Sequence, residues 1–145
     1  MPSESPDWSS PSVRPSANGH QLQRGMVYTR AQLKDIFEIK DATINNGVFR
    51  VRDRHEVWLF VTERKQPDRV QYQDQLVGDE LHWQGQALGR TDHLIISHKA
   101  DGNDILVFYR KARDQYPASG FRLEGHFDYV SHSGSTPANF ILKRS

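Results

Sequence analysis

The sequence of 145 residues contains no cysteine, which excludes disulfide bonds and thiolate metal sites. It also has no apolar run approaching the ~20 residues that a membrane-spanning helix needs. Its first ten residues, MPSESPDWSS, lack a basic region followed by an apolar stretch, so we expect no secretory signal. We therefore expect a protein without a membrane partner, and the absence of cysteine agrees with a cytoplasmic location.

The composition is that of one folded domain with a polar N-terminal segment. Apolar residues make up 36% of the chain and charged residues 26%, and 145 residues suffice for one hydrophobic core. Residues 1–25 differ, because they hold four of the seven prolines and six serines. Such a segment cannot bury enough surface to offset its ordering entropy. We predict a disordered tail or linker over residues 1–25 and a single domain over residues 26–145.

Positive charge is concentrated toward the C-terminus, although the formal net charge is only +1. Residues 105–145 hold six Lys or Arg against three Asp or Glu, whereas residues 26–104 hold eleven against thirteen. A basic C-terminal third suits contact with a phosphate backbone. An imbalance of this size more commonly marks only a solvated face.

The spacing of apolar residues predicts strands along most of the domain. The exception is residues 30–37, where Thr29 and Gln32 form a capping box and Leu33, Ile36 and Phe37 lie at helical spacing. A second short helix is expected within residues 91–99. Strands are expected at residues 47–52, 56–62, 81–86, 105–110, 121–130 and 139–143. We predict an α+β fold that is mostly β, with one or two short helices and a curved, partly closed, barrel-like sheet.

A polar turn between two apolar segments provides the first candidate binding residues. Asp41, Asn45 and Asn46 precede Gly47 and the strand expected at residues 47–52. Asparagine and glycine enter left-handed backbone conformations at low cost, so a tight turn is expected here. Its amides and carboxylate can form hydrogen bonds with the edge of a flat polar ligand such as a nucleobase.

Aromatic residues provide the second candidate group. Tyr72, Trp83 and Tyr109 are residue types that sandwich a base, and such stacking contributes ~1–3 kcal/mol per base. Gln86 follows Trp83 closely and adds an amide. Trp83 shares a strand face with Leu81, so composition alone favours a core position for it.

Histidine is present seven times, but no HxH or HxxxH pair occurs. Because a zinc site without cysteine needs three or four convergent ligands, we expect no metal site, and the sequence predicts no cofactor. We expect His98 and His132 to form hydrogen bonds in loops or to contact a phosphate. Ser131 adds a small donor beside His132, and about half or more of protein–DNA hydrogen bonds go to the backbone.

A metal-dependent nuclease is an alternative interpretation. Asp53, followed by Glu63 and Lys65 after a hydrophobic strand, has the outline of an acid and an E-x-K that hold a divalent ion and activate water. The pattern is common by chance, and such nuclease cores usually carry helices on both sides of their sheet. The few helices expected here argue against it.

A series of short segments resembles a small bacterial domain found in restriction-type proteins. In order they are IKDATINNGVF, WLFVTERK, YQD, LHWQGQ, GRTDHLII, LVFYR, FRLEGHFDYVSHSGS and P-x-N-F-I-L. The resemblance covers about residues 28–142. The domain is related to the domain-of-unknown-function 3427 group and is often attached to HNH nucleases or helicases. It is similar in kind to the SRA and PUA-like readers of modified bases.

The resemblance implies a non-catalytic reader of double-stranded DNA that carries a modified cytosine, with 5-carboxylcytosine as the expected modification. The target base would be flipped out of the duplex into a pocket of the concave sheet, at a cost of a few kcal/mol. Stacking and hydrogen bonds to the base edge would offset that cost. The residues expected to supply them are Tyr72, Trp83, Asp41, Asn45, Asn46 and Gln86.

A carboxylate on the base would also require a cation or several amide donors. The candidates are Lys65, Arg50 and Arg90, of which Lys65 is preferred because it follows the strand next to the polar turn. Arg110 completes the predicted DNA-binding set. The expected partner is an HNH nuclease or helicase module, in cis or in trans, and the domain itself is expected to be a monomer. A second alternative is an RNA- or protein-binding module on the same fold, because such folds are reused for several ligands.

Overall fold

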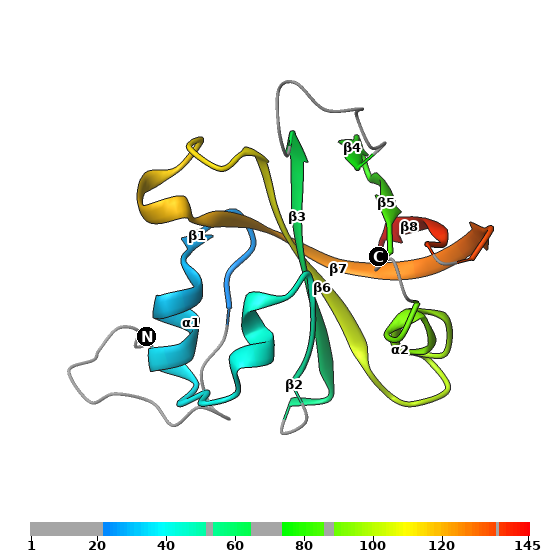
Figure 1. Ribbon diagram of the computed structural model, residues 1–145, viewed down its shortest axis with the longest axis horizontal. Coiled ribbons are helices and arrows are strands. Elements are labelled where there is room, and N and C mark those ends of the chain that lie inside the picture. The colour runs from blue at the N-terminus through cyan, green and yellow to red at the C-terminus, as the bar shows by residue number, and fades with distance from the viewer. Residues whose placement is uncertain (1–21, 52–53, 65–73, 86–88, 136) are drawn as a thin grey trace, which may run out of the picture.

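The computed structural model describes residues 22–51, 54–64, 74–85, 89–135 and 137–145. These residues form a mixed sheet of eight strands with two short α-helices, which confirms the predicted α+β, mostly β class (Figure 1). None of the helices in these ranges is long and apolar enough to cross a membrane. The elements are β1 (Val27–Tyr28), α1 (Arg30–Ile36), the 3₁₀ segment η2 (Ala42–Asn45), β2 (Val48–Val51), β3 (Glu56–Arg64), β4 (Gln75–Val77), β5 (Glu80–Gln84), α2 (Asp92–Ile96), β6 (Asp104–Ala112), the 3₁₀ segment η4 (Pro117–Ser119), β7 (Phe121–Ser133) and β8 (Asn139–Arg144).

The sheet curves strongly but does not close. Its strand order is β2-β3-β6-β7-β8-β5-β4, and β1 pairs with β7. Strands β3 and β6 are parallel, whereas the other neighbours are antiparallel. Within the described ranges, no pairing joins the two outer strands β2 and β4. The predicted curved, barrel-like sheet is therefore present in an open form.

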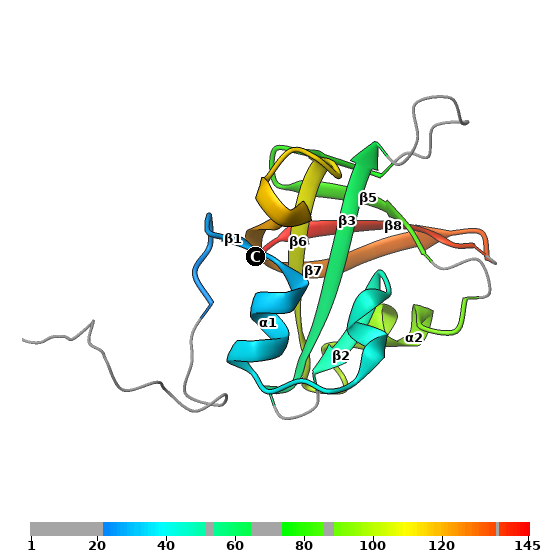
Figure 2. The same cartoon turned by 60° about the vertical axis from the view of Figure 1, so that its left-hand side comes forward.

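Both faces of the central strands are buried, and each face has its own core. Strand β6 shows this most clearly, because residues 105–110 are all buried, as expected from their continuous apolar run. In Figures 1 and 2, α1 and η2 lie on one side of β3 and β6, and α2 lies on the other side with the curled strands β5 and β8. The core beneath α1 contains Leu33, Phe37, Ile44, Phe49, Trp58, Phe60, Phe108 and Phe121. The core enclosed by the curl contains Val57, Leu59, Val61, Leu81, Trp83, Ile95, Ile105, Val107, Tyr109, Phe127, Phe140 and Leu142.

The predicted capping box fixes the start of α1. Thr29 Oγ1 accepts a hydrogen bond from the backbone N–H of Gln32 at 3.0 Å, and Thr29 N donates to Gln32 Oε1 at 2.9 Å. Leu33 is fully buried in the core beneath the helix. A helix of seven residues is too short to be stable alone, so this packing against the sheet must hold it in place.

The N-terminal edge of the described chain contacts the sheet. Gly25 N donates to Leu123 O of β7 at 2.8 Å, and Gln23 N donates to the Tyr28 hydroxyl at 2.9 Å. Residues 22–25 therefore lie along β7. The predicted tail over residues 1–25 stays a prediction, because residues 1–21 lie outside the described ranges.

Candidate functional site

The predicted binding residues are distributed over several parts of the sheet. Asp41, Asn45 and Asn46 lie on the α1 side, where Asp41 is the N-cap of η2 and accepts a hydrogen bond from Thr43 N at 3.0 Å. Arg30 of α1 donates to the Asn46 carbonyl at 3.3 Å. The polar turn is present with both asparagine side chains exposed, but it is a 3₁₀ segment, and the left-handed backbone conformation expected of Asn45, Asn46 and Gly47 is not adopted. It flanks the core beneath α1, whereas Trp83 belongs to the core on the opposite face of the sheet.

Arg110 also lies on the α1 side and is buried. Its guanidinium lies 3.9 Å from the ring centre of Phe121, and it donates to Thr62 Oγ1 at 2.8 Å and to the Ser119 carbonyl at 2.7 Å. Burial, with the nearby charge of Arg30, lowers the pKa of Arg110 to about 10. The side chain therefore holds the η4 turn against the sheet, and its predicted DNA contact stays a prediction.

An aromatic row crosses the ends of β5, β8 and β7. Trp83 pairs with Phe140, and Phe140 pairs with His132. The ring centroids of Trp83 and Phe140 are 5.4 Å apart, those of Phe140 and His132 are 5.7 Å apart, and His132 Nδ1 lies 2.6 Å from the Tyr129 hydroxyl. The row begins in the enclosed core, where Trp83 is 5% exposed, and ends on the surface at His132. The sequence correctly favoured a core position for Trp83, while its stacking on a base stays a prediction.

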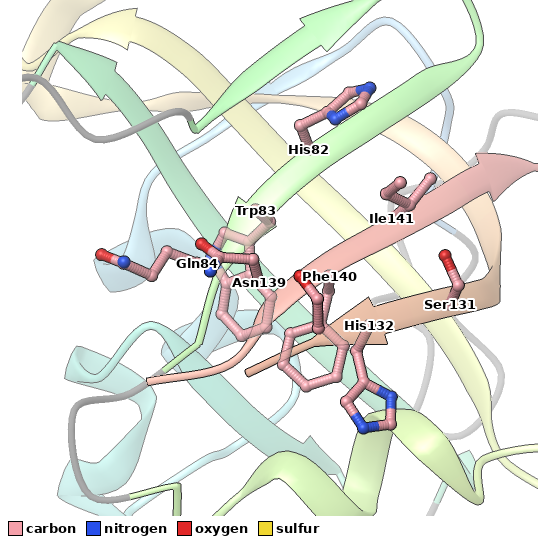
Figure 3. Close-up of a pocket in the computed structure, with 9 residues that line it drawn as sticks. His82, Trp83, Gln84, Ser131, His132, Asn139, Phe140 and Ile141 are labelled. Carbon is pink, nitrogen blue, oxygen red and sulfur yellow. The ribbon is translucent and has the colours of Figure 1, made fainter. Parts of the chain in front are cut away.

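A pocket of about 460 Å³ lies over these same three strands, and Trp83, Phe140 and His132 of the aromatic row are among the residues that line it. Its wall includes the amides of Gln84 and Asn139, the hydroxyl of Ser131 and the imidazole of His82, with Ile141 between them. Figure 3 shows His82, Ile141 and Ser131 on the side of the strands opposite to the rings of Trp83, Phe140 and His132. Successive side chains of a strand alternate between faces, so the side chains of Ser131 and His132 point to opposite faces, although both residues line this pocket. We call this feature the polar pocket.

His98 is 3% exposed and joins α2 to β7. Its Nδ1 lies 2.9 Å from the Asn103 carbonyl, and its Nε2 accepts the backbone N–H of Tyr129 at 3.2 Å. Since a nitrogen that accepts an N–H carries no proton, Nδ1 is the donor of the pair. Both ring nitrogens are occupied by backbone groups, which confirms a hydrogen-bonding role and does not favour a phosphate contact.

Tyr109 and Glu63 meet at the other end of the enclosed core. The Tyr109 hydroxyl donates a short hydrogen bond to Glu63 Oε1. Burial, followed by this bond and by the charge of Glu63, raises the pKa of the Tyr109 hydroxyl well above its ordinary value. Glu63 is one of the three residues of the nuclease alternative. The other two, Asp53 and Lys65, lie outside the described residues, and no group of three metal-ligating side chains occurs within them.

Two of the three cations expected to bind a carboxylate are described. The Nε of Arg50 on β2 is buried and has no hydrogen-bond partner in the part of the chain that the structure describes. Arg90 is exposed in the turn before α2. Lys65, Tyr72 and Gln86 lie outside the described residues, so their predicted roles stay predictions.

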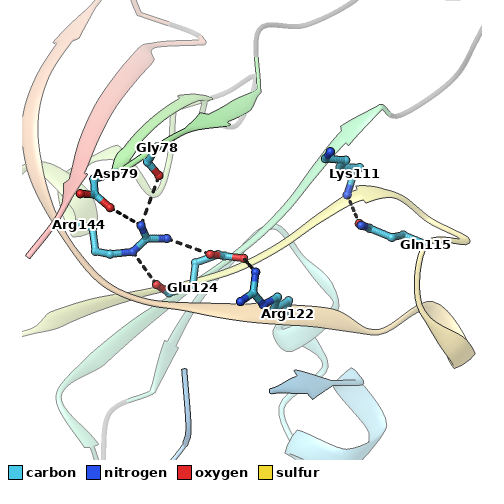
Figure 4. A network of polar contacts seen from close by, with 7 residues as sticks. All are labelled: Gly78, Asp79, Lys111, Gln115, Arg122, Glu124 and Arg144. Atoms are coloured by element: carbon cyan, nitrogen blue, oxygen red, sulfur yellow. Dashed lines mark hydrogen bonds and ion pairs between the residues drawn. The ribbon is translucent and has the colours of Figure 1, made fainter. Parts of the chain in front are cut away.

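A groove that the sequence did not predict lies at the end of the sheet where β6 and β8 finish. It has a volume of about 500 Å³ and contains four cations, Arg24, Lys111, Arg122 and Arg144, around the carboxylate of Glu124. Figure 4 shows Arg144 and Lys111 on opposite sides of Glu124. Three of the four cations come from the basic C-terminal third, so the charge imbalance of that segment was the feature of the sequence that could have indicated this groove. We call this feature the basic groove.

Comparison with known proteins supports the fold without assigning a family. No family model matches the chain, and no curated protein matches it. Among solved structures, the chain is similar to a protein described as modification dependent TagI restriction endonuclease, with a TM-score of 0.52 and 17% sequence identity. The match covers 89% of this chain and 51% of that chain, so the chain spans about half the length of the neighbour. The likeness shows a shared fold, and assignment to the 3427 group stays an expectation.

Proposed function

We propose that this chain is a DNA-binding module that recognises a modified base in duplex DNA. The observation that carries the proposal is the shared fold with a restriction enzyme whose description makes its activity depend on modification. The chain corresponds to about half of that enzyme, and two activities, recognition and cleavage, must be accommodated in the whole. We assign recognition to the fold seen here and no catalysis.

The polar pocket supports this assignment through the chemistry of its wall. Gln84 and Asn139 each offer an amide with donors and an acceptor, and Ser131 offers a hydroxyl. These are the groups that distinguish base edges by hydrogen bonds. Ile141 provides an apolar floor, and the half-exposed ring of His82 can stack on a base. A base flipped into this pocket would regain stacking and hydrogen bonds that offset the few kcal/mol lost on leaving the duplex.

The finer proposal is that the modified base is 5-carboxylcytosine. Its carboxylate requires a positively charged donor, and a charge-assisted hydrogen bond is roughly twice as strong as a neutral one. Arg50 has a buried Nε–H without an acceptor among the described residues, but it lies on β2 and does not line the polar pocket, so the choice of 5-carboxylcytosine rests on the family resemblance. Recognition would be coupled to cleavage by an HNH nuclease or helicase module in cis or in trans.

Fluorescence anisotropy with four otherwise identical duplexes tests the proposal. The central base would be cytosine, 5-methylcytosine, 5-hydroxymethylcytosine or 5-carboxylcytosine, and one salt concentration would be used because phosphate contacts make affinity strongly salt-dependent. We expect the carboxylated duplex to bind at least ~10-fold more tightly, a difference of ~1.4 kcal/mol. Preference for another modified duplex would support recognition of a modified base but reject 5-carboxylcytosine as that base. Equal binding of all four would reject base reading.

A matched pair of variants tests whether the polar pocket recognises the modified base. Gln84→Ala removes an amide from its wall, whereas Gln23→Ala removes the same group from an exposed position beside β7. We expect Gln84→Ala to reduce the ratio of modified to unmodified affinity and Gln23→Ala to leave it unchanged. An unchanged ratio in both variants would place recognition elsewhere.

Two parallel measurements address the alternative functions. Magnesium-dependent cleavage of any duplex would favour the nuclease that uses Asp53, Glu63 and Lys65. Tighter binding of an RNA of the same sequence would favour an RNA-binding module. We expect neither cleavage nor a preference for RNA.

A further inference from the structure

We infer that the basic groove binds the phosphodiester backbone of the DNA strand beside the target base. The inference builds on the proposed function and adds a second contact surface at the other end of β8. Asn139 begins β8 in the polar pocket, and Arg144 ends it in the basic groove. Five residue steps of a strand cover ~17 Å and an odd number of steps reverses the face, so the two surfaces lie at opposite ends and on opposite faces of β8.

The floor of the groove is held in place by Arg144. Its Nε donates to the Glu124 carbonyl at 3.0 Å, and its Nη2 donates to Glu124 Oε1 at 2.9 Å. Its Nη1 contacts the Asp79 carboxylate and the Gly78 carbonyl (Figure 4). All three guanidinium nitrogens are therefore occupied by protein groups. Arg144 shapes the groove and is not the residue expected to bind the ligand.

Three other cations surround this floor and remain available. Among the described residues, neither the Lys111 ammonium nor the Arg24 guanidinium has an ion pair or hydrogen bond, and both side chains are exposed. The Arg122 side chain is 49% exposed and forms an ion pair with Glu124 at 3.5 Å. Arg144 pairs with both Glu124 and Asp79, so these two carboxylates balance the charges of Arg144 and Arg122, and the uncompensated charges of the groove are those of Lys111 and Arg24. Uncompensated positive charge on a single concave surface attracts anions.

The shape of the groove favours a strand over a single small anion. The cations come from the segment before β1, from β6 and from β7, and they enclose a space of about 500 Å³. One phosphate would fill a small part of that space, whereas consecutive phosphodiesters can contact all three cations. The Gln115 amide is directed to the backbone N–H of Lys111, at 2.6 Å, and so fixes the chain at this wall. Neutral hydroxyls, such as that of Tyr116, add donors that phosphates commonly use.

Charge-neutralising variants test the groove. Lys111→Gln and Arg24→Gln each remove one exposed charge, and the double variant removes both. The control is Lys99→Gln, which makes the same change after α2, where the lysine already pairs with Asp128 at 3.6 Å. Binding of the modified and the unmodified duplex would be measured by anisotropy from 50 to 200 mM salt. Thermal unfolding would verify that each variant is folded.

We expect each groove variant to weaken the binding of both duplexes about equally, by roughly 3- to 10-fold at the lower salt concentration. The slope of log K against log salt should decrease by ~0.9 for each lost phosphate contact. The control should change neither quantity. Equal effects of Lys111→Gln and Lys99→Gln, or an unchanged salt slope in the double variant, would overturn the inference. The inference would also be overturned if inorganic phosphate stabilised the protein against unfolding but did not compete with DNA for binding.

The two proposals fail in different ways in this experiment. If the chain does not read a modified base, the wild-type protein will bind both duplexes equally, whatever the groove variants do. If the groove does not contact the backbone, the ratio between the duplexes will persist while the groove variants match the control.

Discussion

Replacement of Arg144 with methionine should destabilise the fold, because it leaves a buried carboxylate without its main partner. The Arg144 side chain is 12% exposed and that of Glu124 is 9% exposed, with 2.9 Å between their charged atoms. Methionine retains much of the side-chain length that packs near Phe127, so the loss is mainly electrostatic. Breaking a buried ion pair by removing one partner typically costs 3–5 kcal/mol. Since Arg122 still lies 3.5 Å from Glu124, we expect the lower end, about 3 kcal/mol.

The double variant Arg144→Met with Glu124→Met separates this explanation from a packing effect. Removing both charges leaves no buried carboxylate unpaired, since the other partner of Arg144, Asp79, is exposed, so the double variant should be more stable than the sum of the two single changes predicts. We expect a coupling energy of about 2 kcal/mol, within the range observed for contacting residues.

Urea unfolding followed by tryptophan fluorescence provides the assay, since Trp58 and Trp83 lie in the two cores. The free energy of unfolding would be compared among wild type, both single variants and the double variant, with the m-value checked for constancy. Single changes that add within ~0.5 kcal/mol would refute the reasoning, because additivity is the behaviour of independent sites.

Two further predictions concern buried polar groups. The raised pKa of the Tyr109 hydroxyl means that, above pH 10, the native state retains a proton that the unfolded state loses, so stability should fall as pH rises from about 10. The difference in unfolding free energy between wild type and Tyr109→Phe should then shrink by up to ~1.4 kcal/mol per pH unit, as measured by urea titrations. A constant difference between pH 9.5 and 11 would contradict the prediction. Replacing His98 with alanine leaves the Tyr129 N–H and the Asn103 carbonyl without their partner. We therefore expect the free energy of unfolding, measured in urea, to decrease by ~2–4 kcal/mol. A decrease below ~1 kcal/mol would argue against the link between α2 and β7.

Local features of the fold could be predicted because short segments encode them. The capping box of Thr29 and Gln32 starts α1 at the expected residue, and its groups lie only three positions apart. The continuous apolar run in residues 105–110 placed β6 centrally, because only a strand covered on both faces can lack polar alternation. The strands β1 and β4, of two and three residues, were missed since they are too short to show a period.

The arrangement of the candidate sites could not be predicted, because it depends on strand order and curl. Arg24 and Arg144 come from opposite ends of the chain and meet only because β8 lies beside β7. The burial of His98 depends on where α2 docks, which no local pattern encodes. The adjacent residues Ser131 and His132 were predicted as one group, yet the alternation of a strand places their side chains on opposite faces.

The proposed function requires this chain to distinguish a modified base from cytosine in duplex DNA. The most direct test is competition, in which unlabelled duplexes that differ only at one central base displace a labelled carboxylated duplex at fixed salt. We expect the carboxylated competitor to displace it at a concentration at least ~10-fold lower than the unmodified competitor, a gap of ~1.4 kcal/mol. Identical displacement curves for all competitors would contradict it.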